Sequence, residues 1–174
     1  MSLPHRESAR AFLVTLAVAL TGCGMLGRYE LTLNQVVLHQ PSSMLSVETI
    51  VDPHLAVCLQ QSLIDQNVTR KEDLRNLNCS DAGIVSLEGL EEFSQIQSLK
   101  LSGNRIRNLL VLERLSSLEQ LWLDGNIVID PIPMLKKASL KRLELAGNRR
   151  LQCPRATYIP AALSLTLPAH CKQK

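Results

Sequence analysis

Aromatic residues are scarce in this chain. Phe, Tyr and Trp make up 3% of its 174 residues, whereas leucine occurs 33 times. An ordinary hydrophobic core uses aromatic rings as bulky fillers, so leucine must fill the interior of this protein instead. Single-stranded nucleic acid is bound largely by stacking of bases on aromatic side chains. Two Phe, two Tyr and one Trp are too few to build such a surface.

The chain also lacks a strong charge of either sign. Its 19 basic and 16 acidic side chains give a formal net charge of +3, and the basic residues are scattered among the acids. A nucleic-acid-binding domain typically carries a dense basic patch and a more extreme charge. We therefore predict that nucleic acid is not a partner and that most charged side chains simply face solvent.

Common catalytic motifs are missing from the sequence. It contains no G-x-S-x-G elbow, no H-E-x-x-H zinc motif and no phosphate-binding loop. Its four histidines are His5, His39, His54 and His170. None of them falls in the repeated middle of the chain described below. We predict no enzymatic activity and no cofactor.

The N-terminal segment, residues 1–22, has the organisation of an export signal. Arg6 and Arg10 precede an apolar run over residues 11–20, which is too short to span a bilayer and suits the core of a signal peptide. The sequence L-T-G-C at residues 20–23 resembles the lipobox of bacterial lipoproteins. That resemblance implies diacylation of the Cys23 sulfur, cleavage before Cys23 and acylation of the new amino group. The alternative is a plain secretory signal followed by an incidental cysteine.

The lipobox resemblance places the protein in the bacterial cell envelope. We expect removal of residues 1–22, with residues 23–50 forming the lipid anchor and an N-terminal segment. Gly24 rather than Asp follows the cysteine, which in a Gram-negative organism favours the outer membrane, facing the periplasm. Tyr29, Leu31 and Leu33 alternate as in a strand, and we expect this segment to pack on the cap that follows it.

The middle of the chain repeats at a constant interval. The repeats start at Leu74, Ile96, Leu118 and Leu140, and apolar residues recur at matching positions after each start. The pattern is L-x-x-L-x-L-x-x-N-x-[I/L], which is that of leucine-rich repeats. Residues 77–91 are similar to the opening coil of internalin-like proteins, whose repeats have the same length.

This resemblance implies an α/β fold, a leucine-rich-repeat solenoid of about four coils over residues 74–152. The L-x-L alternation predicts one short strand per coil, and stacked coils form a parallel sheet that buries a leucine column. Asn104, Asn126 and Asn148 fall where the chain leaves each strand. Their side-chain amides are expected to bond buried backbone groups of neighbouring coils.

Both ends of a solenoid expose core and need caps. Asp52-Pro53 predicts a helix start, and Thr69-Arg70-Lys71-Glu72 predicts a capping box for a short second helix. Residues 51–73 should therefore form a helical N-terminal cap. Residues 153–174 should form a C-terminal cap, since Leu163, Leu165 and Leu167 alternate as in a final strand.

Four cysteines remain besides Cys23, and an exported protein forms disulfides. Four cysteines allow three pairings. We expect the local one, with Cys58–Cys79 holding the N-terminal cap and Cys153–Cys171 holding the C-terminal cap. A metal site of Cys153, His170 and Cys171 is the alternative, and we predict no metal because paired C-x-x-C spacing is absent.

The outward face of the sheet is the candidate binding surface. Alternation points these residues outward: Lys100, Gln120, Trp122, Arg142 and Glu144. Trp is enriched in interface hot spots, so Trp122 is the first candidate contact. In the competing interpretation it only covers neighbouring aliphatic stems, helped by a cation–π contact with Lys100. Glu119 and Lys141 are expected to form a cross-strand pair.

We expect a monomeric, lipid-anchored interaction module whose partner is an unknown envelope protein or peptide. A glycan or lipopolysaccharide binder is the first alternative, acting through the arginines of the turn edge. A structural lipoprotein without a specific partner is the second. The arginines of the turn edge are Arg105, Arg107, Arg149 and Arg150.

Overall fold

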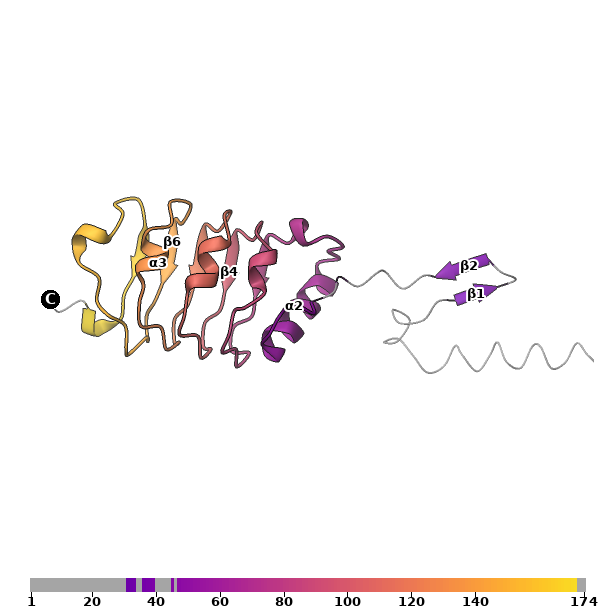
Figure 1. Ribbon diagram of the computed structural model, residues 1–174, viewed down its shortest axis with the longest axis horizontal. Helices are drawn as coiled ribbons and strands as arrows, with labels where there is room; N and C mark the ends of the chain where they lie inside the picture. The colour runs from indigo at the N-terminus through magenta and orange to yellow at the C-terminus, as the bar shows by residue number, and fades with distance from the viewer. Residues whose placement is uncertain (1–30, 34–35, 40–44, 46, 172–174) are drawn as a thin grey trace, which may run out of the picture. The chain divides into compact units, whose positions relative to one another are not determined.

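The computed structural model describes residues 31–33, 36–39, 45 and 47–171 (Figure 1). The chain divides into two compact units, residues 1–44 and residues 45–174. In the first unit, β1 (Leu31–Leu33) pairs antiparallel with β2 (Val36–His39), so the strand predicted from alternation is present. The signal segment and Cys23 lie outside the described residues, and lipidation stays a prediction.

The second unit is built on a five-stranded parallel sheet. Its strands follow one another in chain order, and equivalent residues of successive repeats lie side by side, as Leu77, Leu99, Leu121 and Leu143 do. Four strands come from the four predicted coils, and the fifth comes from the C-terminal cap. The predicted solenoid is therefore confirmed. The strands are β3 (Asn76–Asn78), β4 (Ser98–Lys100), β5 (Gln120–Trp122), β6 (Arg142–Glu144) and β7 (Ser164–Thr166).

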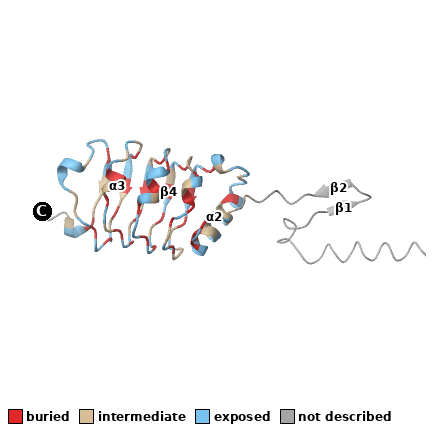
Figure 2. Cartoon of the chain, in the orientation of Figure 1, coloured by how far each residue is buried: buried red, intermediate tan, exposed pale blue. Residues whose placement is uncertain are grey.

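The core is a continuous column of leucine and isoleucine inside the coils. The buried residues run along the interior from one coil to the next (Figure 2). Leu99, Leu121 and Leu143, at the centres of their strands, are completely buried. Phe93 is also completely buried, although the scarcity of aromatics suggested an interior without rings. It lies at the end of the return segment of its coil, where the chain turns back toward the sheet.

The side of each coil opposite the sheet consists of short helical turns. Each contributes buried apolar side chains to the core, among them Leu90, Leu112 and Met134. Short turns of this kind take less width than full α-helices, so consecutive coils stay close enough for their strands to pair. These turns are η4 (Leu90–Glu92), η5 (Leu110–Arg114) and α3 (Ile132–Leu135).

Three buried asparagines connect the coils where the chain leaves the strands. Asn126 accepts a hydrogen bond from the Ile106 N–H at 3.0 Å through Oδ1, and its Nδ2 donates to the carbonyls of Leu101 and Leu123 at 2.8 and 3.1 Å. Asn104 and Asn148 repeat these contacts one coil before and one coil after. The predicted role of the asparagines is confirmed, because each amide satisfies backbone groups of its own coil and of the preceding one.

A single α-helix, α2 (Pro53–Asp65), covers the first coil. Leu55, Leu59 and Leu63 lie on one face of this helix at helical spacing and are buried against the core. The chain leading into the helix also packs on the core, through Ile50 and the half-buried Leu45 and Val47. The compact unit therefore begins a few residues before the predicted boundary at residue 51.

Asp52 joins this helix to the first coil. Its Oδ1 accepts hydrogen bonds from the N–H groups of His54 and Leu55 at 2.9 and 3.2 Å, which is the predicted N-cap. Its Oδ2 accepts from the N–H groups of Val85 and Ser86 at 2.8 and 3.0 Å. Burial raises the pKa of this carboxyl, but the four backbone donors outweigh burial, and the pKa is lowered overall.

The second helix of the cap differs from the prediction. Only one 3₁₀ turn, η3 (Lys71–Asp73), forms there, and its N-cap is Arg70 without a side-chain hydrogen bond. The capping box predicted from Thr69 to Glu72 is therefore wrong. An ion pair instead ties this turn to the solenoid, since Lys71 bonds Glu92 of η4. A long-range contact has replaced the local one.

Both predicted disulfides are present in the structure. Cys58–Cys79 links α2 to the end of β3, and Cys153–Cys171 closes the C-terminal cap. The cysteines of each pair are 21 and 18 residues apart, respectively. Closing loops of this length stabilises a fold by about 3 kcal/mol in the chain-entropy model. The C-terminal cap itself consists of η6 (Ala156–Tyr158), β7 and η7 (Ala169–Cys171).

The charge of Asp52 gives the first testable prediction. In Asp52→Asn one oxygen becomes an NH₂ group that faces two N–H donors, so we expect a loss of about 2–3 kcal/mol of unfolding free energy at pH 7. The folded pKa of Asp52 is lowered, so its stabilisation is complete above its unfolded pKa, near 3.8. The stabilisation is lost as the pH falls through the folded value.

Urea unfolding of both proteins between pH 7 and pH 2 measures this effect. The stability difference between wild type and Asp52→Asn should be constant down to about pH 4 and should then shrink. The shifted pKa of Glu92 is common to both proteins and cancels in the difference. A difference that stays constant down to pH 2 would contradict the assignment.

The asparagine contacts give the second prediction. Asn126→Leu leaves the Ile106 N–H and the Leu101 and Leu123 carbonyls without partners, so the unfolding free energy should fall by about 3 kcal/mol. The matched control is Asn76→Ala on the exposed face of β3, which should change the unfolding free energy by less than about 0.5 kcal/mol. Equal losses in the two variants would show that the buried amide is not the stabilising element.

Candidate binding surface

The outward face of the sheet presents two columns of side chains that cross the strands. Because the register is unbroken, equivalent residues of successive strands are neighbours in each column. All five side chains predicted for the binding surface lie on this face. The first column holds Asn76, Ser98, Gln120, Arg142 and Ser164, and the second holds Asn78, Lys100, Trp122, Glu144 and Thr166.

Trp122 and Lys100 form a contact at the centre of the face. The Nζ of Lys100 lies 5.2 Å from the centroid of the Trp122 ring, within the range of a cation–π interaction. Trp122 is half-buried, whereas Lys100 is exposed. This contact is the one expected from the competing interpretation, in which Trp122 covers the aliphatic stems of its neighbours. It also places the Lys100 ammonium group beside the Trp122 ring.

The remaining charges of the face are paired with one another. Arg142 approaches Glu144 at 3.7 Å, and the predicted pair of Lys141 with Glu119, at the flank of the sheet, is present at 2.8 Å. Over the described part of the chain, Lys100 has no carboxylate within ion-pair distance. Lys100 is therefore the one charged side chain of these strands that forms no ion pair with a described residue.

A hollow of about 380 Å³ opens beside Lys100, where helix α2 meets the sheet. Strands β3 and β4 form its floor, and the C-terminal end of α2 forms one wall. The sequence did not indicate this hollow, because the position of the helix end above the strands depends on packing. The lining residues are Ser62, Asp65, Gln66, Asn76, Leu77, Asn78, Ser98 and Lys100.

Comparison with the solved structure of an internalin supports the architecture. Over 70% of its length this chain is similar to internalin C2 of Listeria monocytogenes, with a TM-score of 0.58 and 22% identity, and it covers 55% of that chain. An internalin F structure from the same organism is similar over 70% of this chain and 45% of that one, with a TM-score of 0.49 and 18% identity. This chain thus spans about half the length of these proteins.

The fold is an internalin-like leucine-rich-repeat solenoid. No protein-family model matches the sequence, and no curated protein matches it. The likeness to the internalins is one of fold alone at this level of identity. The properties of the leucine-rich-repeat surface must therefore be argued from its own residues.

The turn edge of the solenoid carries the four arginines singled out in the sequence. All four are exposed, and none forms an ion pair with a described residue. The repeat places Ile127, which is 44% exposed, between Arg105 and Arg149. Acidic residues interrupt the edge, including Asp124, which accepts a hydrogen bond from Ser102 Oγ at 2.6 Å. The mixed charge makes this edge a weaker candidate than the sheet face.

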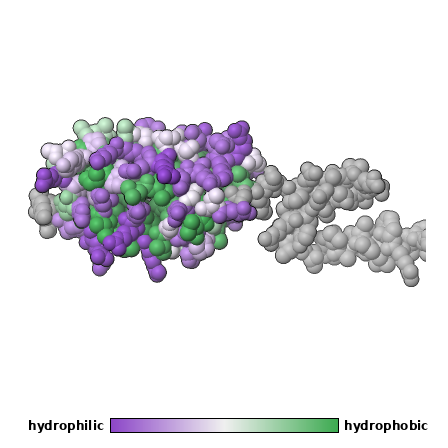
Figure 3. Space-filling view, in the orientation of Figure 1, coloured by the Kyte–Doolittle hydropathy of each residue, from purple (hydrophilic) through white to green (hydrophobic). Residues whose placement is uncertain are grey.

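The outer surface of the repeats also mixes polar and apolar character. Hydrophobic patches lie between hydrophilic ones across the solenoid in the view of Figure 3. Val85 and Leu110 are each more than half exposed. Among the described residues, no helix is both long enough and apolar enough to cross a membrane.

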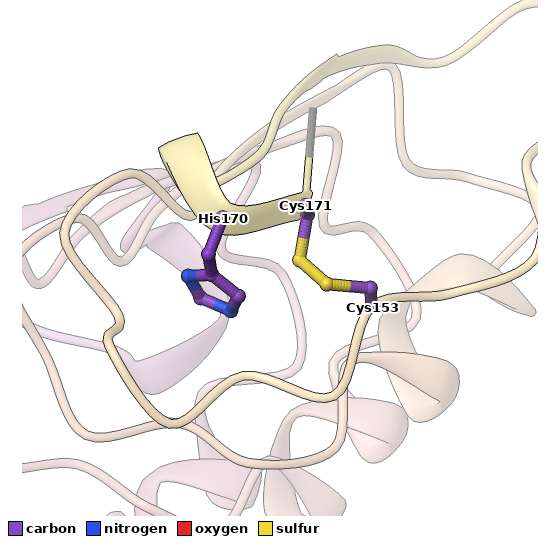
Figure 4. Close-up of side chains that lie close together, drawn as sticks. All are labelled: Cys153, His170 and Cys171. Carbon is purple, nitrogen blue, oxygen red and sulfur yellow. A yellow bond between two sulfur atoms is a disulfide. The ribbon is translucent and has the colours of Figure 1, made fainter. Parts of the chain in front are cut away.

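Two of the three residues of the alternative metal site, Cys153 and Cys171, form a disulfide. The ligand atoms of Cys153, His170 and Cys171 all lie within 4.8 Å of one another (Figure 4). However, the two sulfurs are bonded to each other, and zinc requires thiolates. His170 Nε2 lies 3.0 Å from the Leu151 carbonyl and makes a hydrogen bond with it. His170 therefore fastens the cap to the last coil.

Proposed function

We propose that this protein is a lipid-anchored interaction module of the bacterial cell envelope that binds its partner through the sheet face. It acts by binding rather than by catalysis, as a monomer and without a cofactor. The observation that carries the proposal is the Lys100 ammonium group, which is exposed, held over Trp122 and free of any described carboxylate. A partner can pair with this charge without first breaking an ion pair within the described protein.

The size of the face limits the partner. Five strands about 4.8 Å apart, each three residues long, present an area of about 250 Å². A standard protein–protein interface needs about 800 Å² from each partner. The sheet face therefore suits a peptide or an extended segment of a protein, and a folded partner must add contacts from the caps or turns.

The lipid anchor is proposed from the sequence around Cys23. The protein would be held at the outer membrane, facing the periplasm, by three acyl chains on Cys23. Two chains already give stable anchoring, because each buried methylene contributes about 0.8 kcal/mol. Residues 24–44 would connect the anchor to the solenoid.

Chemical crosslinking in the native envelope, followed by mass spectrometry, tests the interaction. We expect Lys100→Glu and Trp122→Ala to reduce the yield of a specific crosslinked partner by about tenfold. Reversal of the charge at Lys100 should change the unfolding free energy by less than about 0.5 kcal/mol, because the side chain is exposed. Lys136→Glu, an exposed lysine outside the sheet, is the matched control and should leave the yield unchanged. Absence of any partner in the wild type would refute the proposal.

Metabolic labelling with palmitate tests the anchor. The wild-type protein should incorporate the label and fractionate with the outer membrane. Cys23→Ser should lose both properties, since the acceptor sulfur is gone. Unlabelled wild-type protein that is nevertheless cleaved and secreted would support the plain secretory signal instead.

A further inference from the structure

The hollow beside Lys100 lies at one end of the sheet face, where the end of α2 forms a wall. Gln66, near the end of α2, donates from Nε2 to the Asn76 carbonyl at 2.9 Å, so the outer edge of β3 is covered. A chain that lies across the strands and runs toward β3 therefore meets the helix. The sheet face ends there in a pocket of about 380 Å³, which lies within the usual size range of ligand sites.

The hollow is lined by hydrogen-bond donors that have no acceptor within the described protein. The side-chain amide of Asn76 makes no hydrogen bond there, and Asn78 uses only its Oδ1, which accepts from the N–H and hydroxyl of Ser80. Lys100 adds an ammonium group that forms no ion pair with any described carboxylate. The two asparagines and Lys100 thus line the same hollow, and the Lys100 ammonium group lies beside the Trp122 ring of the next strand. Such a set of donors fits an anion with two acceptor oxygens.

We propose that this hollow binds the free C-terminal carboxylate of an extended peptide lying across the sheet face. The carboxylate pairs with Lys100 and accepts hydrogen bonds from the amides of Asn76 and Asn78. The preceding peptide residues cross the strands over Trp122 toward β7. This assignment rests on the proposed function, and it adds the chemical class of the partner and the end of the chain that is recognised.

One feature favours a chain terminus over an acidic side chain within a longer segment. Helix α2 blocks continuation of the peptide beyond β3, so the chain must end or turn away at the hollow. Asp65 lines the same hollow, and its negative charge weakens the binding of any carboxylate there, so the attraction of Lys100 has to outweigh it. The five strands span about 20 Å, which matches about six extended residues.

Titration of hexapeptides into the purified full chain, kept in detergent with both disulfides intact, tests this assignment. The probes are a hexapeptide of alternating alanine and serine with a free C-terminus, its C-terminal amide, and the amide carrying one central glutamate. Calorimetry gives the affinities. Emission from Trp122, the one tryptophan in the chain, gives a second readout next to Lys100.

We expect the free acid to bind at least about tenfold more tightly than either amide. In Lys100→Gln this preference should disappear. It should persist in Lys136→Gln, which changes an exposed lysine outside the hollow. Asp65→Asn should tighten binding of the free acid by about threefold and leave the amide unchanged.

Equal binding of acid and amide, or a preference that survives in Lys100→Gln, would overturn the assignment, as would absence of binding at millimolar peptide. Tighter binding of the glutamate amide would show that the site takes an acidic side chain instead, which also overturns it. None of these outcomes affects the crosslinking result. A partner whose crosslink depends on Lys100 would leave the interaction face standing while the carboxylate assignment fails.

Discussion

No coil of this solenoid can bury its own leucines. Each turn of the chain presents a few apolar side chains inward, and only the next coil removes them from water. A constant repeat length suits this constraint, since coils of equal length keep equivalent residues of their strands side by side. The buried asparagines exist for the same reason. Where the chain leaves the sheet its backbone groups lose their strand partners, and amides such as that of Asn126 replace them.

At each end of the solenoid, where no further coil follows, a cap covers the apolar side chains of the terminal coil. At the N-terminus, α2 supplies the missing apolar surface, and Asp52 together with Cys58–Cys79 keeps the helix in place. At the C-terminus, β7 extends the sheet, and Cys153–Cys171 and His170 hold the cap to the last coil. Each cap combines apolar cover with a covalent link. This combination suits a small domain whose core is only one coil wide.

The features that repeat were predictable from the sequence, and those that depend on a single long-range contact were not. Periodicity fixed the strands, their register and the outward direction of Trp122. The capping box at Thr69 was a local pattern, and it is absent: Glu72 lies near Arg70 instead, and Lys71 pairs with Glu92 of a later turn. The hydrogen bond from the Val85 N–H to Asp52 was likewise not predictable from the sequence. No local pattern relates a helix cap to a residue 33 positions away.

The difference between repeated features and single long-range contacts also explains why only some residues of the candidate site could be predicted from the sequence. Lys100 and Trp122 were assigned to the outward face because their positions follow from alternation. Asp65 and Gln66 entered the site only through the packing of α2, which depends on the volumes of buried leucines and on the disulfide. The cap needed for stability therefore also shapes the hollow. The end cap places side chains of α2 beside the outward residues of β3 and β4.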